Sequence, residues 1–600
     1  MAKKNNQLLM LLSAVGLMAF TACTDDTYDL SDIDMTIGVG SDEGFTLPTS
    51  STREIHLEDL LELNNSETVV IDGDGDYLFQ QKGNDVAPVH PNIAKVLISS
   101  GTTTNIPVKI EVPDLPAGFE MLPVGTPLPG TASSIRREIQ TFDYEDTHPA
   151  EIKSLKSAEM EGTIDVEITF TEDLNGFIPE FKTFDVEFPK YMSIQITQCS
   201  KSPKSKDGNI IKFENVPTNK ALTIKAIIES LDFTSSKQDE NNVLTLDADK
   251  IKMIGDLKVD VTYDDAVKGS GDINNLCINS EMKIGGLTIV GATGSFAPEI
   301  EISDIGEVTL SDMPDFLTDD AVVVDLYNPQ ITVDIKSDMS VPGFLKGALV
   351  AKDENGNEIS RVDIPEVKIN SVEENGGTSN ILICRRDENI KGSFTEVAVV
   401  PNLSDIISKI PHTISFETQA RADESRDDSY IKLGHDYTIT PAYSIKAPIA
   451  FGEKARIVYN DTLDGWNEDV QDLELASTAS VKVTANIENR IPAYLTMKAH
   501  AIGVDGKEIS DVTVTVDGNI AASEDGKTPK TSPISIEIKQ NGKNGLKALD
   551  GLIFSIEAAA SDGGNAAVVG QTLNAKNHSL TAKDIKVTVV GKIVIKEEED

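Results

Sequence analysis

Apolar and polar residues alternate along much of the chain. In TIDVEITF (163–170) and SVKVTANI (480–487) the period is two, which is typical of strands that bury one face. DENGN (353–357) and VDGK (504–507) lie between such runs, and their Asn-Gly and Asp-Gly pairs supply the positive φ angles of tight hairpin turns. This pattern predicts antiparallel β-hairpins repeated along the sequence.

Helical patterns are short. Each spans two or three turns, and they occur at residues 56–63, 150–160, 403–410 and 545–552. Because strands and turns dominate, we expect an all-β fold of tandem antiparallel β-sandwich (Ig-like) domains with a few short helices.

Part of the sequence is written twice at an offset of 150 residues. VPGFLKGALVAKDENGNEIS (341–360) matches IPAYLTMKAHAIGVDGKEIS (491–510) at seven of 20 positions without a gap. Upstream, LTIVGATGSFAP (287–298) matches YTITPAYSIKAP (437–448) in the same register. A match of this length indicates a domain duplication, and a weaker copy is visible at 163–181.

The repeat and the prolines that end each unit suggest a division of the chain. A chain of 600 residues is also too long for one hydrophobic core. We expect a signal peptide at 1–22, a tether at 23–50, an N-terminal β-rich domain at 51–148, a divergent sandwich repeat at 149–298, and two further repeats at 299–448 and 449–600.

The first residues have the pattern of a secretory signal. Lys3 and Lys4 precede a 15-residue apolar run from Leu8 to Ala22, which is too short for a stable transmembrane helix. FTAC (20–23) resembles the lipobox of bacterial lipoproteins, with Phe20 where that motif usually has Leu. The resemblance implies that Cys23 is acylated, with palmitate as one expected chain, and anchors the protein to a membrane. Ordinary cleavage with Cys23 unmodified is the alternative.

The residues that follow Cys23 extend this resemblance. TDD (24–26) resembles the acidic export signal of Bacteroidota-type surface lipoproteins. It implies an outer-membrane lipoprotein that faces the cell exterior, although a solvated tether would read the same way.

The charge of the chain excludes one class of partner. Removal of Lys3 and Lys4 with the signal peptide leaves 51 basic and 98 acidic residues, and 51 − 98 = −47. Such a surface repels phosphates, so we expect no nucleic-acid partner.

Three cysteines remain after Cys23. Cys199, Cys277 and Cys384 are widely spaced and odd in number, so they form neither a disulfide framework nor a metal cluster. We expect buried small apolar residues, with one disulfide bridge left open.

One stretch offers metal ligands. In IDGDGDYLF (71–79), Asp72, Asp74 and Asp76 occupy the first three ligand spacings of an EF-hand loop. Tyr77 stands where the loop needs Gly, and Gly83 where it needs Glu. We therefore expect a β-turn and no resident cofactor, with weak Ca²⁺ binding as the alternative.

Other chemistry is scattered. The seven histidines form no HExxH motif, although His435 and His578 fall near equivalent points of the repeat. Trp466, the single tryptophan, aligns with Phe316, which favours a shared apolar contact over a sugar platform. No nucleophile elbow or phosphate-binding glycine loop is present, and paired carboxylates for glycoside hydrolysis are not singled out.

These observations favour a non-enzymatic, lipid-anchored cell-surface protein with a binding or structural, adhesive role for a protein or glycan ligand. A pilus-type adhesin or anchor subunit is the first alternative. The second is a glycan-binding or glycan-cleaving partner of an outer-membrane transporter.

Overall fold

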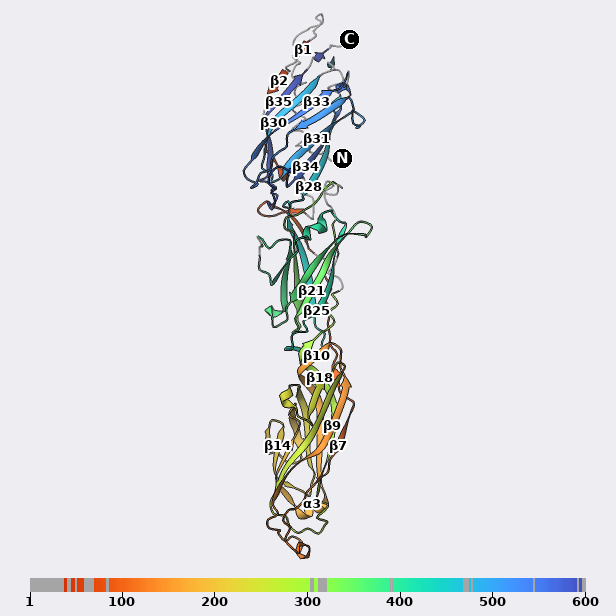
Figure 1. Cartoon of the computed structure of the whole chain (residues 1–600), viewed down its shortest axis with the longest axis vertical. Helices are drawn as coiled ribbons and strands as arrows, with labels where there is room; N and C mark the ends of the chain where they lie inside the picture. The colour runs from red at the N-terminus through yellow and green to blue at the C-terminus, as the bar shows by residue number, and fades with distance from the viewer. Residues whose placement is uncertain are drawn as a thin grey trace.

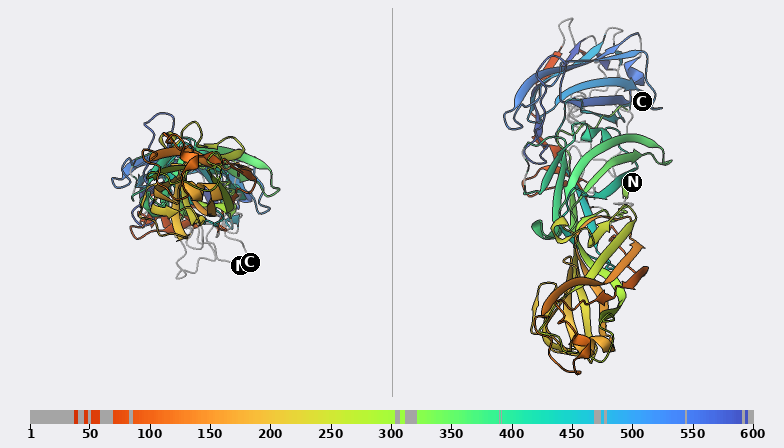
Figure 2. Two further views of the ribbon diagram at one scale, coloured as in Figure 1. Left: turned by 90° about the horizontal axis from the view of Figure 1, so that it is seen from below. Right: turned by 60° about the horizontal axis from the view of Figure 1, so that its bottom comes forward.

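Antiparallel β-sheet makes up nearly all of the regular structure. The computed structural model describes residues 37–39, 45–48, 51–58, 69–82, 86–302, 307–310, 321–388, 390, 392–467, 474–475, 479–542, 545–590 and 593–595. Between the strands of this part lie α3 (Glu172–Phe177) and a few short 3-10 helices. The all-β prediction is confirmed. Paired sheets form three sandwiches stacked along one axis (Figure 1), and they overlie one another when seen from below (Figure 2).

The first sandwich lies at the lower end of Figure 1 and has the longest strands. Its strands are β6 Val96–Leu97, β7 Gly101–Asn105, β8 Val108–Lys109, β9 Ser133–Thr147, β10 Ile152–Phe170, β11 Glu180–Glu187, β12 Met192–Cys199, β13 Ser205–Asp207, β14 Ile210–Pro217, β15 Leu222–Asp232, β16 Val243–Leu246, β17 Lys250–Tyr263, β18 Cys277–Phe296 and β26 Ser429–Lys432. One sheet has the order β12-β15-β10-β18-β26, with β6 and β8 also paired to β18. The other has the order β13-β14-β11-β17-β9-β7, with β16 paired to β17.

The second sandwich occupies the middle of the molecule. Its strands are β4 Val69–Ile71, β5 Tyr77–Lys82, β19 Glu307–Thr309, β20 Gln330–Ser337, β21 Gly343–Lys352, β22 Glu358–Ile369, β23 Thr378–Cys384, β24 Glu396–Val399, β25 Thr413–Ala422 and β27 Ile439–Pro448. The sheets have the orders β19-β25-β21-β22 and β24-β23-β20-β27-β5-β4.

The third sandwich lies at the upper end of Figure 1. Its strands are β2 Phe45–Pro48, β3 Ile55–His56, β28 Arg456–Leu463, β30 Ser480–Asn489, β31 Tyr494–Ile502, β32 Val512–Asp517, β33 Lys530–Gln540, β34 Gly551–Ala559 and β35 Ser579–Val590. The sheets have the orders β28-β34-β31 and β2-β35-β30-β33-β32, with β3 paired to β35. A small sheet joins β1 Ile37–Val39, β36 Ile593–Ile595 and β29 Glu474–Leu475.

All three sandwiches share one pattern of strand pairing. In chain order, the six core strands are β10, β11, β12, β14, β15 and β17 in the first; β19, β20, β21, β23, β25 and β27 in the second; and β28, β30, β31, β33, β34 and β35 in the third. In each, the fifth strand lies between the first and the third, and the second lies between the fourth and the sixth. Successive core strands therefore alternate between the two sheets. This is not the ABED/CFG order of immunoglobulin domains, so the Ig-like part of the prediction is not confirmed.

A seventh strand completes each sandwich, always beside the sixth core strand and always from the N-terminal part of the chain. β2 pairs with β35, β5 with β27, and β9 with β17, all antiparallel. The N-terminal segment thus follows the molecule from the third sandwich to the first, and the rest of the chain returns in the opposite direction.

The strands between residues 51 and 148 are consequently shared among the sandwiches. β3 lies in the third, β4 and β5 in the second, and β6 to β9 in the first. The N-terminal domain expected at 51–148 has no sheet of its own among the described residues. The other boundaries stay predictions.

Both predicted turns are confirmed, but only 353–357 joins a hairpin, that of β21 and β22. The 504–507 turn is closed by the single bridge of Ile502 and Glu508, and β31 and β32 on either side of it belong to different sheets. Asp353 N donates to Asn357 O at 2.9 Å, and Gly503 N donates to Lys507 O at 3.0 Å. Gly356 (φ 81°) and Gly506 (φ 71°) adopt the left-handed conformation at equivalent points.

The helix expected at 150–160 is wrong, because these residues belong to β10. The pairing of β10 with β18 is interrupted by register shifts between Ile152 and Ser154 and between Leu155 and Ser157. Such bulges break the period of two, so the apolar residues here fall at spacings that resemble a helix.

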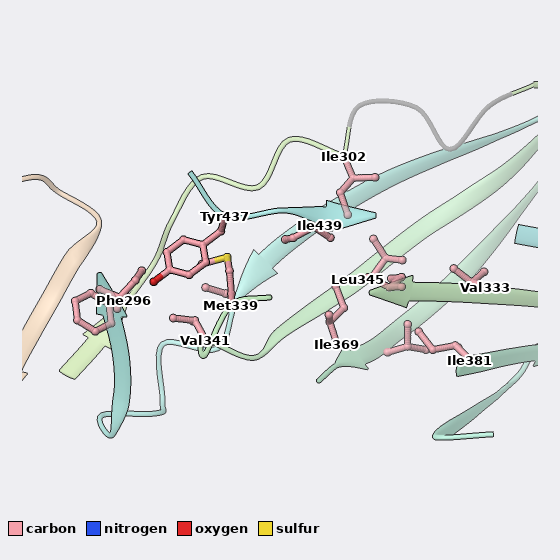
Figure 3. Packing of buried hydrophobic residues seen from close by; sticks show 14 of the residues in the cluster. Phe296, Ile302, Val333, Met339, Val341, Leu345, Ile369, Ile381, Tyr437 and Ile439 are labelled. Atoms are coloured by element: carbon pink, nitrogen blue, oxygen red, sulfur yellow. The ribbon is translucent and has the colours of Figure 1, made fainter. Parts of the chain in front are cut away.

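The apolar core continues across the junction between the first and second sandwiches. Figure 3 shows Phe296, at the end of β18, near Tyr437 and Met339 of the second sandwich. All three side chains are buried. β26 strengthens this junction, since it belongs to the second half of the chain yet pairs with β18. The two sandwiches therefore share buried surface and a sheet.

Candidate functional site

The turn between β4 and β5 carries the three carboxylates of the candidate calcium loop. Asp72 Oδ1 accepts hydrogen bonds from the backbone N–H groups of Asp74 at 2.9 Å and Asp76 at 3.0 Å. Asp76 Oδ1 accepts one from Asn574 Nδ2 at 2.9 Å. These bonds confirm the β-turn. Within the described residues, no group of three or more acidic, histidine or cysteine side chains is arranged to hold a metal ion.

This turn instead fastens the second sandwich to the third. Asn574 Nδ2 also donates to Asp74 O at 3.0 Å, and Tyr77 N donates to Leu573 O at 2.9 Å. His578 stabilises the loop that carries Asn574, because its Nδ1 accepts the N–H of Asn574 at 3.0 Å. Burial lowers the pKa of His578 to about 4, against a smaller opposing effect of Asp76. The imidazole is thus neutral at pH 7 and serves as an acceptor.

The described histidines form no metal-binding group, although His56 pairs with Ser579, next to His578. His435 and His578 both precede the sixth core strand of their sandwich, β27 and β35, which confirms their equivalent placement. The ring of His435 packs edge-on against Tyr437, while His148 contacts the carbonyls of Pro149 and Asp247. These contacts are structural.

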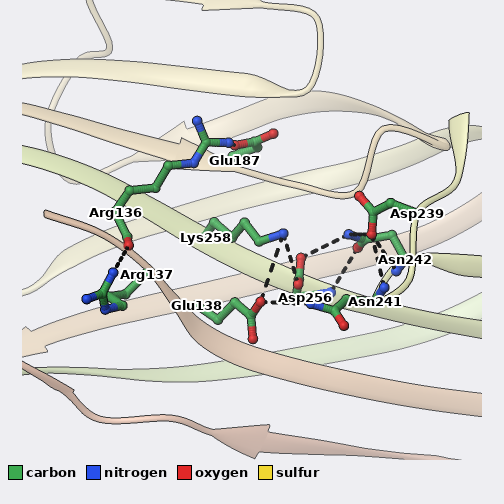
Figure 4. Close-up of polar contacts among 9 residues, drawn as sticks. All are labelled: Arg136, Arg137, Glu138, Glu187, Asp239, Asn241, Asn242, Asp256 and Lys258. Carbon is green, nitrogen blue, oxygen red and sulfur yellow. Dashed lines mark hydrogen bonds and ion pairs between the residues drawn. The ribbon is translucent and has the colours of Figure 1, made fainter.

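A polar network in the first sandwich joins β9, β17 and the loop before β16 (Figure 4). Asp256 and Asn242 exchange two hydrogen bonds, Asn242 Nδ2 to Asp256 Oδ1 and Asp256 N to Asn242 Oδ1, each of 3.1 Å. Lys258 Nζ lies 3.1 Å from Asp256 Oδ2 and 4.0 Å from Glu138 Oε1. Asp239 Oδ1 accepts from the side chain and backbone of Asn242, at 2.9 and 3.0 Å.

Sequence reasoning missed this network. Its members lie on two strands and a loop, and the strands are brought together by pairing of residues about 120 positions apart, as for Lys258 and Glu138 (258 − 138 = 120). The register of this pairing shifts between Leu257 and Lys258, within the network. The alternation of the strands carries no signal of it.

Electrostatics couples the network's charges. Burial and the nearby charge of Asp256 raise the pKa of Glu138. Burial opposes ionisation of Lys258, but its contact with Asp256 prevails and raises the pKa of the ammonium group. For Asp239, burial acts to raise the pKa, but hydrogen bonds from Asn242 and Asn241 lower it overall.

The network is suited to hold a loop, not to process a substrate. Asp256 is 3% exposed, and both its oxygens face partners within the protein. A pair of carboxylates that hydrolyses a glycosidic bond must face the substrate from two sides. We therefore assign the network to fixing residues 239–242 on the sheet.

The remaining residues singled out by sequence take ordinary positions or lie outside the description. Cys199, Cys277 and Cys384 are free thiols, with Cys384 buried and the others half-buried. Trp466 packs against the apolar core, as expected. Cys23, the proposed lipid site, and Phe316 lie outside the described residues.

Among the described residues, no helix is long and apolar enough to cross a bilayer. No protein-family model matches the chain, and no curated protein is similar to it.

Among solved structures, the chain is similar to a "putative secreted protein" from Parabacteroides distasonis, with 14% identity over 49% of this chain and 81% of that one and a TM-score of 0.32. It also matches a particle protein of infectious bursal disease virus, with 8% identity over 90% of this chain and 83% of that one and a TM-score of 0.12. At such TM-scores neither likeness shows a shared fold.

Proposed function

We propose that this protein is a non-enzymatic, lipid-anchored surface protein that holds its first sandwich away from the cell as a binding or adhesive domain. The observation that carries this proposal is the direction of the N-terminal segment. The signal peptide and lipobox would place Cys23 in the outer membrane, on its exterior face. Its acyl chains would then fix the N-terminal end of the chain.

The path of the segment gives this anchor a consequence. Ile37 follows Cys23 by 14 positions, which span at most about 50 Å when extended. Ile37 opens β1, which pairs with β36, and β2 pairs with β35 of the third sandwich. An anchored protein would therefore keep the third sandwich next to the membrane, with α3 and the first sandwich at the far end (Figure 1).

Stiffness supports the same role. The first and second sandwiches share buried side chains and the pairing of β26 with β18. The second and third are joined through the Asp72–Asp76 turn and Asn574. A molecule whose parts are fastened in this way can carry a domain outward from a surface.

Labelling and proteolysis of intact cells test the proposal. We expect metabolic labelling with a palmitate analogue in the wild-type protein and none in Cys23→Ser. We also expect external protease to remove epitopes inserted in the loop between β12 and β13 of the first sandwich (200–204) while the cells stay intact. Labelling of Cys23→Ser, or full protection of the epitope, would contradict the proposal.

The same preparations address the alternatives. A ladder of detergent-resistant oligomers would favour a fimbrial subunit. Hydrolysis of polysaccharides or peptides by the purified chain would contradict the non-enzymatic assignment.

A further inference from the structure

The far end of the first sandwich presents two apolar side chains to solvent. They belong to the segment 113–130, which we call the tip loop and which extends beyond α3 at the lower end of Figure 1. Met121 is 93% exposed and Val124 is 68% exposed. Two large apolar residues this exposed, three positions apart in one loop at the end of an elongated molecule, form a candidate interaction site.

The tip loop is held in one conformation by its own hydrogen bonds and by the β17–β18 loop. Gly125 N donates to Lys268 O at 2.8 Å, and Lys268 N donates to Thr126 O at 2.8 Å. Thr126 Oγ1 donates to Pro123 O at 2.7 Å. These bonds fix the backbone on both sides of Val124.

The base of the loop is fixed by Lys268. Its ammonium group lies 5.4 Å from the ring centres of both Phe119, in the tip loop, and Phe177, in α3. Cation–π contacts on two rings tie the loop to the helix. Because Met121 follows Phe119 within the same 3-10 turn, its backbone is held in place before docking, which lowers the entropic cost of ordering the loop.

The tip loop and the elements packed against it carry exposed acidic side chains. They are Asp114 and Glu120 of the tip loop, Glu172 of α3, and Asp265 and Asp272 of the β17–β18 loop, whereas Asp264 of that loop is paired with Lys182. The β17–β18 loop contacts both the tip loop and α3: Asp265 Oδ1 accepts from Gly130 N at 2.9 Å, and Asp272 N donates to Asp173 of α3 at 3.0 Å. A partner must therefore tolerate, or use, negative charge near an apolar centre.

From this arrangement we infer that the tip loop docks into a protein partner that has an apolar pocket bordered by lysine or arginine. The centre supplies buried contacts and the nearby acidic side chains supply orientation and rate of encounter. An anionic bilayer is disfavoured, because its surface repels the same carboxylates. The inference rests on the proposed function in one respect, that this end faces outward.

Panning of a phage-displayed library of random peptides tests the inference on the full mature chain carrying Cys23→Ser. We expect enrichment of peptides that combine Lys or Arg with aromatic or aliphatic residues. Their binding should weaken at least about tenfold in Met121→Ser/Val124→Ser and in Asp114→Lys/Glu120→Lys. It should also weaken as salt rises from about 50 to about 500 mM.

Val504→Ser is the matched control, because Val504 is 72% exposed in the turn between β31 and β32 of the third sandwich. We expect it to leave binding unchanged, and circular dichroism to show all variants folded. No enrichment, enrichment of peptides without basic residues, or equal binding to the Met121→Ser/Val124→Ser variant would overturn the inference. So would tip-dependent binding to phosphatidylcholine vesicles, which would assign the loop to lipid. Panning in solution does not depend on the anchor, so its failure is distinguishable from failure of the cell-surface experiment.

Discussion

The first and second sandwiches share a strand order but obtain their seventh strand at very different separations along the chain. In the first, β9 pairs with β17 over 14 residue pairs and leads directly into β10. In the second, β5 pairs with β27 over five, and Pro448 lies opposite Leu78, 370 positions earlier (448 − 78 = 370). The third resembles the second, with four pairs between β2 and β35.

The difference shows that sandwiches with the same strand order can depend to different degrees on segments that are remote in the sequence. The ladder of β9 and β17 is long and joins residues about 120 positions apart, against about 370 for β5 and β27, so the first sandwich is largely made from contiguous sequence. The second closes its sheet with β5, which the whole first sandwich separates from β19 to β27 along the chain, and a pairing this remote forms late and costs more chain entropy. We expect the second sandwich to be the more sensitive to changes in its added strand.

The largest effect should come from truncating the buried side chains of β5, the added strand of the second sandwich. Tyr77 and Phe79 of β5 are buried, and each truncation to Ala removes about 3–5 kcal/mol. The double variant should lose hydrogen-exchange protection in β5 and β27 while β9 and β17 keep theirs. Val504→Ala, at an exposed site, is the control. Equal loss of protection in β17 would show that the sandwiches do not differ in independence.

A second prediction concerns the first sandwich alone. Lys258→Met leaves Asp256 buried without its cationic partner, which should lower the free energy of unfolding by about 3–5 kcal/mol. Adding Asp256→Asn should restore part of the loss. Urea denaturation followed by hydrogen exchange should place the change in β16 and β17. A loss that appears first in β27 would mean that the sandwiches unfold together.

The third prediction uses pH to address the junction of the second and third sandwiches. Burial lowers the pKa of His578 to about 4. Between about pH 6.5 and pH 4, His578 is therefore protonated in the unfolded chain but neutral in the folded one. Stability should therefore fall as pH drops from about 6.5 to about 4, by about 3 kcal/mol in total. Thermal unfolding of the third sandwich at several pH values measures this slope.

Two variants separate His578 from other titrating groups. His578→Asn should flatten the slope in this range. His435→Gln, at the corresponding but exposed position of the second sandwich, should leave it in place. An unchanged slope in His578→Asn would show that another group carries the pH dependence.

The smallest expected effect tests the duplication itself. Gly356 and Gly506 have positive φ angles and open space where a Cβ would stand. Alanine at either site should therefore cost only the backbone term, about 1 kcal/mol. Chemical denaturation should give similar values for the two variants. A clear difference between the two losses of stability would mean that the equivalent turns contribute differently to the free energy of unfolding.

Much of the local structure could be predicted from sequence. The period of two in 163–170 and 480–487 gave strands, and the Asn-Gly and Asp-Gly pairs gave turns, because both depend on neighbouring residues. The helix at 150–160 failed where bulges in β10 broke the period. The Asp72–Asp76 turn was foreseen, but its attachment to Asn574 was not, since the two are some 500 positions apart.

By itself, the sequence determined the all-β class, the repeated tight turns, the acidic surface and the N-terminal features that suggest a lipid anchor. Only the tertiary structure decided that the N-terminal segment supplies a strand to every sandwich, that Asp256 and Lys258 meet Glu138 and Asn242, and that Met121 and Val124 stand exposed at the far end. The physical reason is range. Propensity and alternation act between neighbours, whereas strand pairing and exposure depend on which remote segments release the most free energy by packing together.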